Sequence, residues 1–166
     1  MRFAIEQQLS APPEVVARAF ADPELYASFG DLPKLSRPEV IDHVADGDQV
    51  RLQIRYRFVG DLSSAARAVL DPARLTWVEH TVHDLAGLTT SFSLEPDHYA
   101  DRFTCSGSVR FAAADGGTRR HGQGELRVRA PLVGGAVERA LVSGLQEHLR
   151  DEVPVVEAFV ATQPPA

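Results

Sequence analysis

Residues 50–58 read Val-Arg-Leu-Gln-Ile-Arg-Tyr-Arg-Phe, the most regular alternation of apolar and polar side chains in the chain. Successive side chains of a β-strand point to opposite faces of the sheet, so the apolar ones share one face and the polar ones the other. The apolar set is Val50, Leu52, Ile54, Tyr56 and Phe58. Such a strand predicts an antiparallel sheet with one covered face and one face in water.

The same period of two continues on both sides of this stretch. Residues 3–9 alternate in the same way and predict the first strand. Ala-Asp-Gly-Asp at 45–48 predicts a hairpin turn before the strand at 50–58. Further strands are expected over 75–84, 88–94, 103–111 and 118–129. We therefore expect a curved antiparallel sheet of about seven strands. For the strand at 75–84 the pattern leaves open which side faces inward, because Trp77 and Glu79 lie on one side and Val78 and His80 on the other.

Two helix starts follow the first predicted strand. Ser10 or Ala11 is expected to cap the first short helix, which has prolines in its first turn. Asp22 and Pro23 are expected to begin the second short helix. A further short, Ala-rich helix is expected within 62–70.

The C-terminal region has apolar residues at steps of three and four, which predict an amphipathic helix over about 135–161. Pro154 lies inside it and is expected to kink it. Leu141 and Leu145, in the middle of the apolar stripe, are expected to be fully buried against the sheet. The whole stripe is Val137, Leu141, Leu145, Leu149, Val153, Val156 and Val160.

An apolar sheet face needs a cover, and the long helix has the matching stripe. The predicted class is therefore α+β, a helix-grip arrangement in which the curved antiparallel sheet wraps around the long C-terminal helix. The length of 166 residues suits one domain. We expect that domain over 1–162, followed by a disordered tail at 163–166.

Three segments resemble a known family. They are LSAPPEVVARAFADPELYASF at 9–29, GDLSSAARAVLDPARLTWVEHTV at 60–82 and PLVGGAVERALVSGLQEHL at 131–149. These segments are similar to the START/Bet v 1-like (SRPBCC) superfamily and, within it, to the actinobacterial DUF2505 family. The resemblance implies a helix-grip fold around a deep apolar cavity. It carries no catalytic motif over to any residue of this chain.

Composition excludes several classes of protein. The formal charge of −6 argues against a nucleic-acid binder, which normally has a basic patch. No apolar run approaches the roughly 18–20 residues of a membrane span, and the N-terminus lacks a secretory pattern, so we expect a cytoplasmic protein without stable membrane insertion. Cys105 is the single cysteine, which we interpret as a small buried core residue. We predict no metal and no cofactor.

Other polar and glycine-rich motifs have structural interpretations. His80 and His83 form an H-x-x-H pattern, but on a strand they point to opposite faces and cannot share one metal. The loop Asp97–Asp101 is interpreted as a solvated hairpin. We interpret Gly134–Gly135 as a tight turn with close packing of strand and helix, and Glu138–Arg139 as solvated helix surface.

Aromatic side chains and glycines share the inward face of the predicted sheet. Gly107 and Gly124 leave gaps, for which two compatible interpretations exist. The glycines bend the strands and let the helix approach closely, or they leave volume for an apolar ligand. The predicted ligand-binding residues are Ile54, Tyr56, Phe58, Trp77, Phe92, Phe103, Gly107, Gly124, Leu141 and Leu145.

Three functional hypotheses remain open. The first is a protein that sequesters or transports a small apolar molecule, lipid or polyketide-like, entering between the long helix and the loops near 30–35 and 96–101. The second is an enzyme similar to the polyketide cyclases and aromatases of this fold. Its acid–base candidates are Tyr56, Glu79, His80 and His83, and since no spacing singles one out, no catalytic residue is assigned. The third is an interaction module similar to co-chaperones of this fold, which requires an exposed apolar patch.

Overall fold

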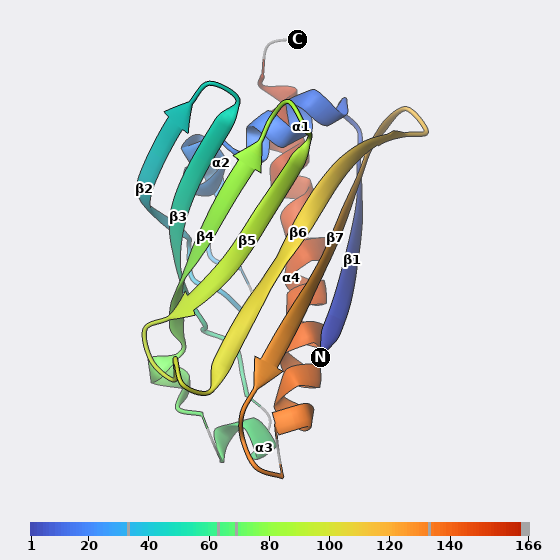
Figure 1. The fold of residues 1–166 in the computed structure, drawn as a ribbon. Helices are drawn as coiled ribbons and strands as arrows, with labels where there is room; N and C mark the ends of the chain where they lie inside the picture. Colours follow the sequence, from blue (N-terminus) through green and yellow to red (C-terminus); the bar gives the residue numbers. More distant parts are fainter. Residues whose placement is uncertain (33, 63, 69, 133, 164–166) are drawn as a thin grey trace.

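A seven-stranded sheet packed on one long helix forms the frame of the computed structural model (Figure 1). The structure describes residues 1–163 except for 33, 63, 69 and 133. Within this described part, the strands follow the order β1-β7-β6-β5-β4-β3-β2, and every neighbouring pair is antiparallel. Their bounds are β1 Arg2–Leu9, β2 Glu39–Asp46, β3 Gln49–Arg57, β4 Thr76–Asp84, β5 Thr89–Pro96, β6 Phe103–Ala114 and β7 Gly117–Val128.

The helices lie on one side of this sheet. Figure 1 shows α4 running along one sheet face, with α1 and α2 at one end of it and α3 near the other end. Their bounds are α1 Pro13–Phe20, α2 Pro23–Ser28, α3 Ser64–Arg67 and α4 Gly134–Ala161, with a 3₁₀ turn at Pro72–Arg74. The predicted α+β helix-grip class is therefore confirmed, including the two short helices after the first strand. Of the predicted tail, residues 164–166 lie outside the described residues, as do 63 and 69 of the predicted helix at 62–70.

The two short helices begin in different ways. The Asp22 side chain accepts a hydrogen bond from the Glu24 N–H at 2.9 Å, and Pro23 is the first helical residue, as predicted. The predicted cap of α1 at Ser10 or Ala11 is wrong, because Pro12 occupies that position without a side-chain hydrogen bond. The Ser10 hydroxyl instead donates to the Glu157 carboxylate on α4, and so it is not available as a cap.

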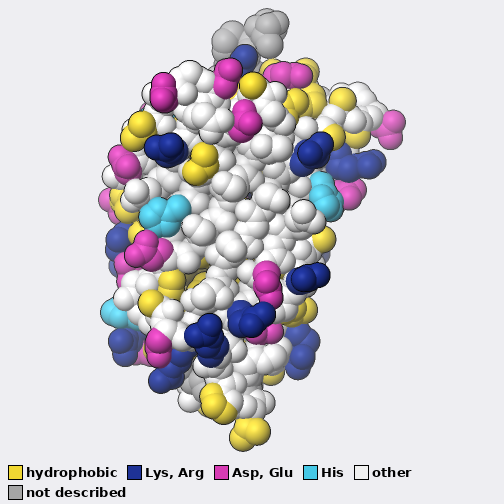
Figure 2. Space-filling model, viewed as in Figure 1, with side chains coloured by type: hydrophobic (Ala, Val, Ile, Leu, Met, Phe, Trp, Pro, Cys, Tyr) yellow, Lys and Arg dark blue, Asp and Glu magenta, His cyan; other side chains and the backbone are white. Residues whose placement is uncertain are grey.

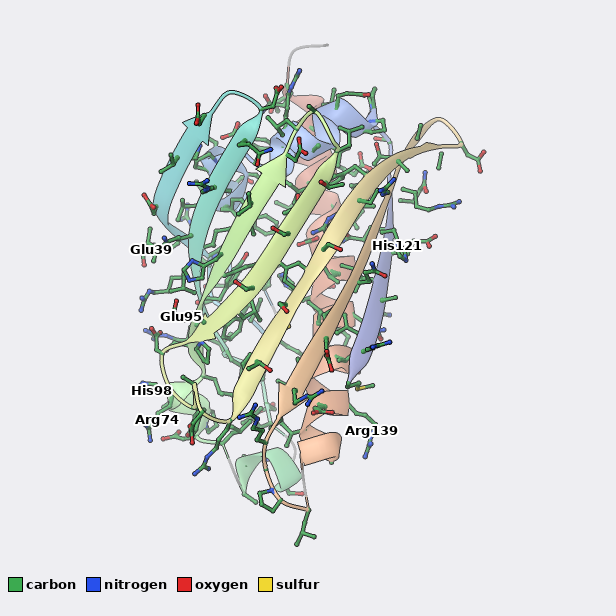
Figure 3. All side chains as sticks on the ribbon, viewed as in Figure 1. Glu39, Arg74, Glu95, His98, His121 and Arg139 are labelled. Atoms are coloured by element: carbon green, nitrogen blue, oxygen red, sulfur yellow. The ribbon has the colours of Figure 1, made fainter. Side chains whose placement is uncertain are left out.

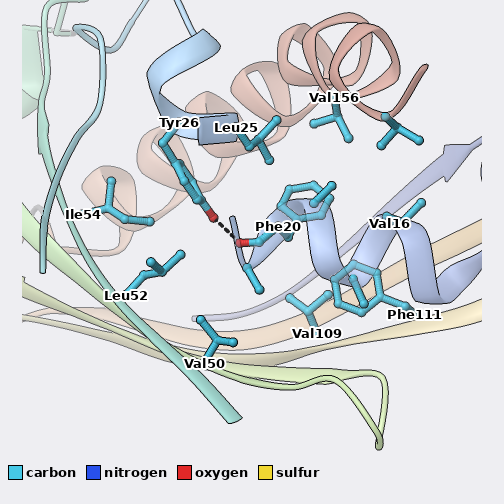
Figure 4. Close-up of a cluster of buried hydrophobic side chains, with 14 of the residues drawn as sticks. Val16, Phe20, Leu25, Tyr26, Val50, Leu52, Ile54, Val109, Phe111 and Val156 are labelled. Atoms are coloured by element: carbon cyan, nitrogen blue, oxygen red, sulfur yellow. Dashed lines mark hydrogen bonds between the residues drawn. The ribbon is translucent and has the colours of Figure 1, made fainter. Parts of the chain in front are cut away.

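The core is divided into two clusters. One lies under α1 and α2, where Val16, Leu25, Leu52 and Val156 are almost completely buried (Figure 4). The other lies toward α3 and the start of α4, and its buried members are Phe3, Leu62, Cys105, Leu126, Val128, Val137 and Val142. The prediction that Cys105 is a buried core residue is confirmed.

The middle of α4 differs from the prediction. Leu141 and Leu145 are only half-buried, whereas Val137 and Leu149 on either side are buried. At about 100° per residue, both leucines point in directions between those of Val137 and Leu149, so the helix has not simply rotated. The prediction that they are fully buried is wrong: both leucines pack against the cluster of Cys105 and Val137 and still keep part of their surface accessible.

Candidate functional site

The register of β3 and β4 decides which face of β4 points inward. Tyr56 pairs with Trp77, and Ile54 pairs with Glu79. Residues paired across a ladder point to the same face, and both Tyr56 and Ile54 are buried. Trp77 and Glu79 therefore face α4, which settles the question that the sequence left open.

Several large side chains of the sheet point toward α4 and still keep accessible surface, as do two leucines of α4 that point toward the sheet. We call this set the inner surface, and its members are Phe58, Trp77, Glu79, Phe92, Leu94, Phe103, Leu141 and Leu145. Its phenylalanines and leucines pack against the buried cluster that contains Cys105 and Val137. A side chain that faces a covering helix and still has accessible surface is in contact with water rather than fully enclosed by protein. The inner surface is our candidate functional site.

Glu79 is the carboxyl group of this surface. It lies between Ile54 on β3 and Leu94 on β5, and the same cross-strand row continues through Cys105 and Leu126. No described residue forms a hydrogen bond with its carboxylate. Burial raises the pKa of Glu79 to about 7; the Arg120 charge opposes this rise, and the Glu152 charge adds a smaller upward effect. Because a partly buried carboxylate without a hydrogen-bonded partner is costly for folding, Glu79 is a candidate for function.

Two tyrosines lie near this carboxyl group. Tyr56 stacks on Trp77, with ring centroids 5.8 Å apart and ring planes at 18°. Burial raises the pKa of both Tyr26 and Tyr56, and the Glu79 charge raises it further. Tyr26 donates its hydroxyl hydrogen to the Phe20 carbonyl oxygen at 2.9 Å, which occupies that donor (Figure 4). Both phenols are therefore neutral at physiological pH.

Sequence reasoning missed a buried ion pair that joins the sheet to α4. Arg120 on β7 donates to the Glu152 carboxylate on α4 at 2.8 Å, and both side chains are about nine-tenths buried. Gln7 on β1 donates to the same Glu152 oxygen at 2.9 Å. The Arg120 guanidinium also lies 4.1 Å from the centroid of the Phe20 ring. The sequence offered a weak indication, because Gln7 and Glu152 are polar residues within otherwise apolar faces.

The two histidines of the H-x-x-H pattern lie on opposite faces, as predicted. His80 faces outward and contacts Glu95 at 2.9 Å. His83 is 2% exposed and shares hydrogen bonds of 2.9 Å with the hydroxyls of Thr81 and Thr90. Burial, aided by the Arg120 charge, lowers the pKa of His83 to about 4, so it is neutral at physiological pH. No group of three or more His, Cys, Asp or Glu in the described part of the chain could hold a metal ion.

Aromatic rings cover the inward glycines. A Cβ atom at Gly107 would lie 2.6 Å from Cζ of Phe92 and 2.2 Å from the Gln123 carbonyl oxygen. A Cβ atom at Gly124 would lie 2.6 Å from Cζ of Phe3. The glycines thus permit close approach, but of neighbouring phenylalanines and backbone rather than of the helix. The hypothesis that they leave open volume is wrong at these two positions.

The predicted turn and helix start are also located. Residues Asp97–Asp101 connect β5 to β6, where Arg74 lies 3.3 Å from His98 (Figure 3). A Cβ atom at Gly134 would lie 2.5 Å from the Val128 carbonyl oxygen, which confirms the close packing of strand and helix. Glu138 accepts a hydrogen bond from the Val128 N–H at 2.8 Å, so its interpretation as solvated surface is wrong.

One part of the predicted entrance is closed. A cleft of about 20 Å³ lies between the segment after α2 and α4, lined by Leu32, Lys34, Glu147, His148 and Asp151. Lys34 pairs with Glu147 across it. Because ligand pockets are typically about 300–1,000 Å³, this cleft is far too small for an organic ligand. Residue 33 of this segment lies outside the described residues.

The outward face of the sheet differs from the inner surface. Figure 2 shows charged side chains of both signs scattered over this face. The arginines of β3 and Arg127 of β7 are exposed on this face, and two of them pair with carboxylates: Arg55 with Asp97 and Arg127 with Glu125. The side of the sheet away from α4 is therefore an ordinary solvated surface.

Comparison with known proteins gives a family and a fold. Residues 4–160 match the family described as a protein of unknown function, DUF2505. No curated protein matches the sequence. None of the helices in the described part of the chain is both long and apolar enough to cross a bilayer.

Three solved structures illustrate the shared fold. TTHA0849 from Thermus thermophilus is 21% identical with a TM-score of 0.69, covering 98% of this chain and 100% of that one. The Zhui aromatase/cyclase from Streptomyces sp. R1128 is 16% identical with a TM-score of 0.63, covering 97% and 93%. Norcoclaurine synthase from Thalictrum flavum, in complex with dopamine and hydroxybenzaldehyde, is 13% identical with a TM-score of 0.66, covering 99% and 89%. At these identities the likeness shows the fold alone.

Proposed function

The chain belongs to the DUF2505 family and has the helix-grip fold, and from this premise we propose that it binds a small, mostly apolar molecule between the sheet and α4. Its role would be to sequester or carry that molecule in the cytoplasm. The observation that supports this most is the incomplete burial of Leu141 and Leu145. They point at the sheet from the centre of the covered face of α4, between buried Val137 and Leu149.

Removal of apolar surface from water would supply the binding energy, at roughly 25 cal/mol per Å². The phenylalanines of the inner surface, Phe58, Phe92 and Phe103, are partly accessible and serve this purpose. Ile54 is fully buried and Tyr56 is 8% exposed, so these two support the inner surface from below rather than forming its accessible part. Gly107 and Gly124 act indirectly, by making room for the rings of Phe92 and Phe3.

Filling the space tests this proposal. The neutral fluorescent probe N-phenyl-1-naphthylamine is titrated into the wild type and into Leu141→Trp, Leu145→Trp and Ser143→Trp. Ser143 lies on the exposed side of the same helix and is the matched control. We expect at least a tenfold loss of probe affinity in the two leucine variants and no change in Ser143→Trp. Tenfold equals about 1.4 kcal/mol, which lost burial of a few methylenes can supply.

The melting temperature of each variant is measured in parallel. Unchanged probe affinity in folded Leu145→Trp would contradict the proposed location of the ligand. A wild type that binds no apolar probe would contradict the proposed function itself.

An enzymatic function is the second candidate, and the position of Glu79 is the observation that favours it. A carboxyl group with a pKa of about 7 can take up and release a proton near neutral pH, and neutral Tyr56 lies close by. The test is the cyclisation of a synthetic poly-β-ketone by the wild type and by Glu79→Gln. Equal rates, at the level of the reaction without protein, would exclude this chemistry.

A further inference from the structure

Among the described residues, Glu79 is a carboxyl group of the inner surface without an ion-pair partner of its own; the Arg120 charge opposes the rise of its pKa but does not cancel it. Arg120 and Glu152 neutralise each other at 2.8 Å. Burial lowers the pKa of both His83 and His148, which disfavours a positive charge on these imidazoles. Among the described residues, Glu79 therefore has neither a hydrogen-bond donor nor a cation paired with it.

The surroundings of Glu79 are mainly apolar on each side. Its neighbours in the cross-strand row are Ile54 and Leu94. The stacked rings of Tyr56 and Trp77 form the next row. A bare carboxylate in such a place is unfavourable, and a protein gains nothing in stability by keeping it. Glu79 keeps part of its surface accessible, and a molecule bound at the inner surface would contact it there.

We propose that the molecule bound at the inner surface carries one basic nitrogen, and that its ammonium group binds the Glu79 carboxylate while its apolar body lies against Leu94, Phe103 and the leucines of α4. This inference rests on the proposed function and adds the chemical class of the ligand. The ammonium group supplies a positive charge and N–H donors. Hydrogen bonds from such donors to the Glu79 carboxylate are short and strong because both partners are charged. Aromatic faces beside the carboxylate favour a cation as well.

The same arrangement discriminates against acids. A fatty acid or another carboxylate placed with its polar end at Glu79 would bring two like charges together, and one of them would have to take up a proton. A neutral alcohol could donate one hydrogen bond but would leave the charge of Glu79 unbalanced. We therefore expect affinity in the order amine, alcohol, carboxylate for molecules with the same apolar body.

Octylamine, octanol and octanoic acid provide a matched test, because they share one chain length. Each is titrated at pH 8.5 against N-phenyl-1-naphthylamine bound to the wild type, Glu79→Gln and Glu95→Gln. Glu95 is an exposed carboxylate on the outward face of the neighbouring strand, and its side chain is 74% exposed. We expect the wild type and Glu95→Gln to bind octylamine at least tenfold more tightly than octanol. Glu79→Gln should lose this preference while its octanol affinity stays within threefold.

Failure of this inference can be told apart from failure of the proposed function. If octanol displaces the probe but the amine has no preference, or if Glu79→Gln keeps the preference, the inference is overturned and apolar binding stands. If the wild type binds neither the probe nor any of the three molecules, both fail. Should Glu79→Gln not fold, the melting temperature of the wild type decides: a larger rise with octylamine than with octanol supports the inference, and equal rises overturn it.

Discussion

Glu79 on β4 faces Ile54 on β3 across the strand ladder, so an ionisable carboxyl group stands beside a side chain with no accessible surface. The complete burial of Ile54 shows that water has little access to this part of the sheet. The raised pKa of Glu79 follows mainly from that burial. The apolar surroundings of Glu79 therefore have two effects: ionised Glu79 destabilises the folded state, and its carboxyl group takes up a proton near neutral pH.

The pH dependence of stability should reveal this cost. Burial raises the pKa of Glu79 from 4.5 to about 7, so the folded state holds this proton more tightly than the unfolded state does. The free energy of unfolding should thus fall as pH rises from 4.5 to 7, by about 3 kcal/mol at most. Urea unfolding of Glu79→Gln, compared with the wild type, should show a variant that gains relative stability across this window. A difference that is constant with pH would contradict the burial of an unpaired Glu79.

His83 should have the opposite effect. Its pKa is lowered from 6.5 to about 4, so the unfolded state takes up the proton first as pH falls. The stability that neutral His83 gives is complete above pH 6.5 and is lost as pH falls toward 4, by about 3 kcal/mol. Relative to the wild type, His83→Gln should become more stable as pH falls through this window. If the urea midpoints of the wild type and His83→Gln change in parallel from pH 7 to 4, His83 is not buried as a neutral group.

Removing one partner of the buried pair of Arg120 and Glu152 should destabilise the fold strongly, whereas replacing both by apolar residues should change stability little. Arg120→Met leaves the Glu152 carboxylate buried without its partner and should cost about 3–5 kcal/mol. The double variant Arg120→Met/Glu152→Met should recover most of this loss, because two buried charges are removed together. As a control, Arg127→Met breaks an exposed pair with Glu125 and should cost less than about 1 kcal/mol. Additive losses in the double variant would refute the coupling.

The inward glycines give a prediction about packing. Gly107→Ala places a Cβ atom 2.2 Å from the Gln123 carbonyl oxygen, and backbone cannot move aside easily. The expected loss of stability is about 1–3 kcal/mol or more. Gly30→Ala is the matched control, because no atom lies within 4 Å of its Cβ position. That change should stay within about 0.5 kcal/mol. Similar melting temperatures for both variants would mean that Gly107 is not tightly enclosed.

The leucines of α4 should separate stability from binding. Leu149 is 7% exposed, and its truncation to Ala should cost about 2–5 kcal/mol. Leu141 is only half-buried, so Leu141→Ala should cost clearly less. Urea unfolding of the two variants measures the difference directly. An equal loss of stability in the two variants would show that Leu141 is packed as tightly as Leu149.

The order of elements could be predicted from the sequence because local patterns carry it. Alternation at 50–58 placed a strand with one wet face, and the Asp22-Pro23 pair placed the start of α2. The cap of α1 could not be predicted, since Ser10 is engaged by Glu157, which lies 147 residues further along the chain. Contacts between such distant residues leave no trace in a local pattern.

The site was only partly predictable for the same reason. The sequence named Glu79 as one of two alternatives, and only the register with Ile54 decided between it and His80. Leu141 and Leu145 were correctly placed on the covered side of α4, but periodicity gives direction and not distance, so their incomplete burial could not be foreseen. Arg120 and Glu152 were missed because the local pattern shows only that Glu152 lies within an apolar helix face, and not which residue of the sheet it contacts.

Native mass spectrometry tests the central claim most directly. The wild type and Leu145→Trp are purified without denaturation from the organism that produces the protein, and each is measured before and after addition of N-phenyl-1-naphthylamine. We expect a one-to-one complex with a small molecule in the wild type, lost on denaturation and absent from Leu145→Trp. A wild-type spectrum with the mass of the polypeptide alone, both as purified and after addition of the probe, would contradict it.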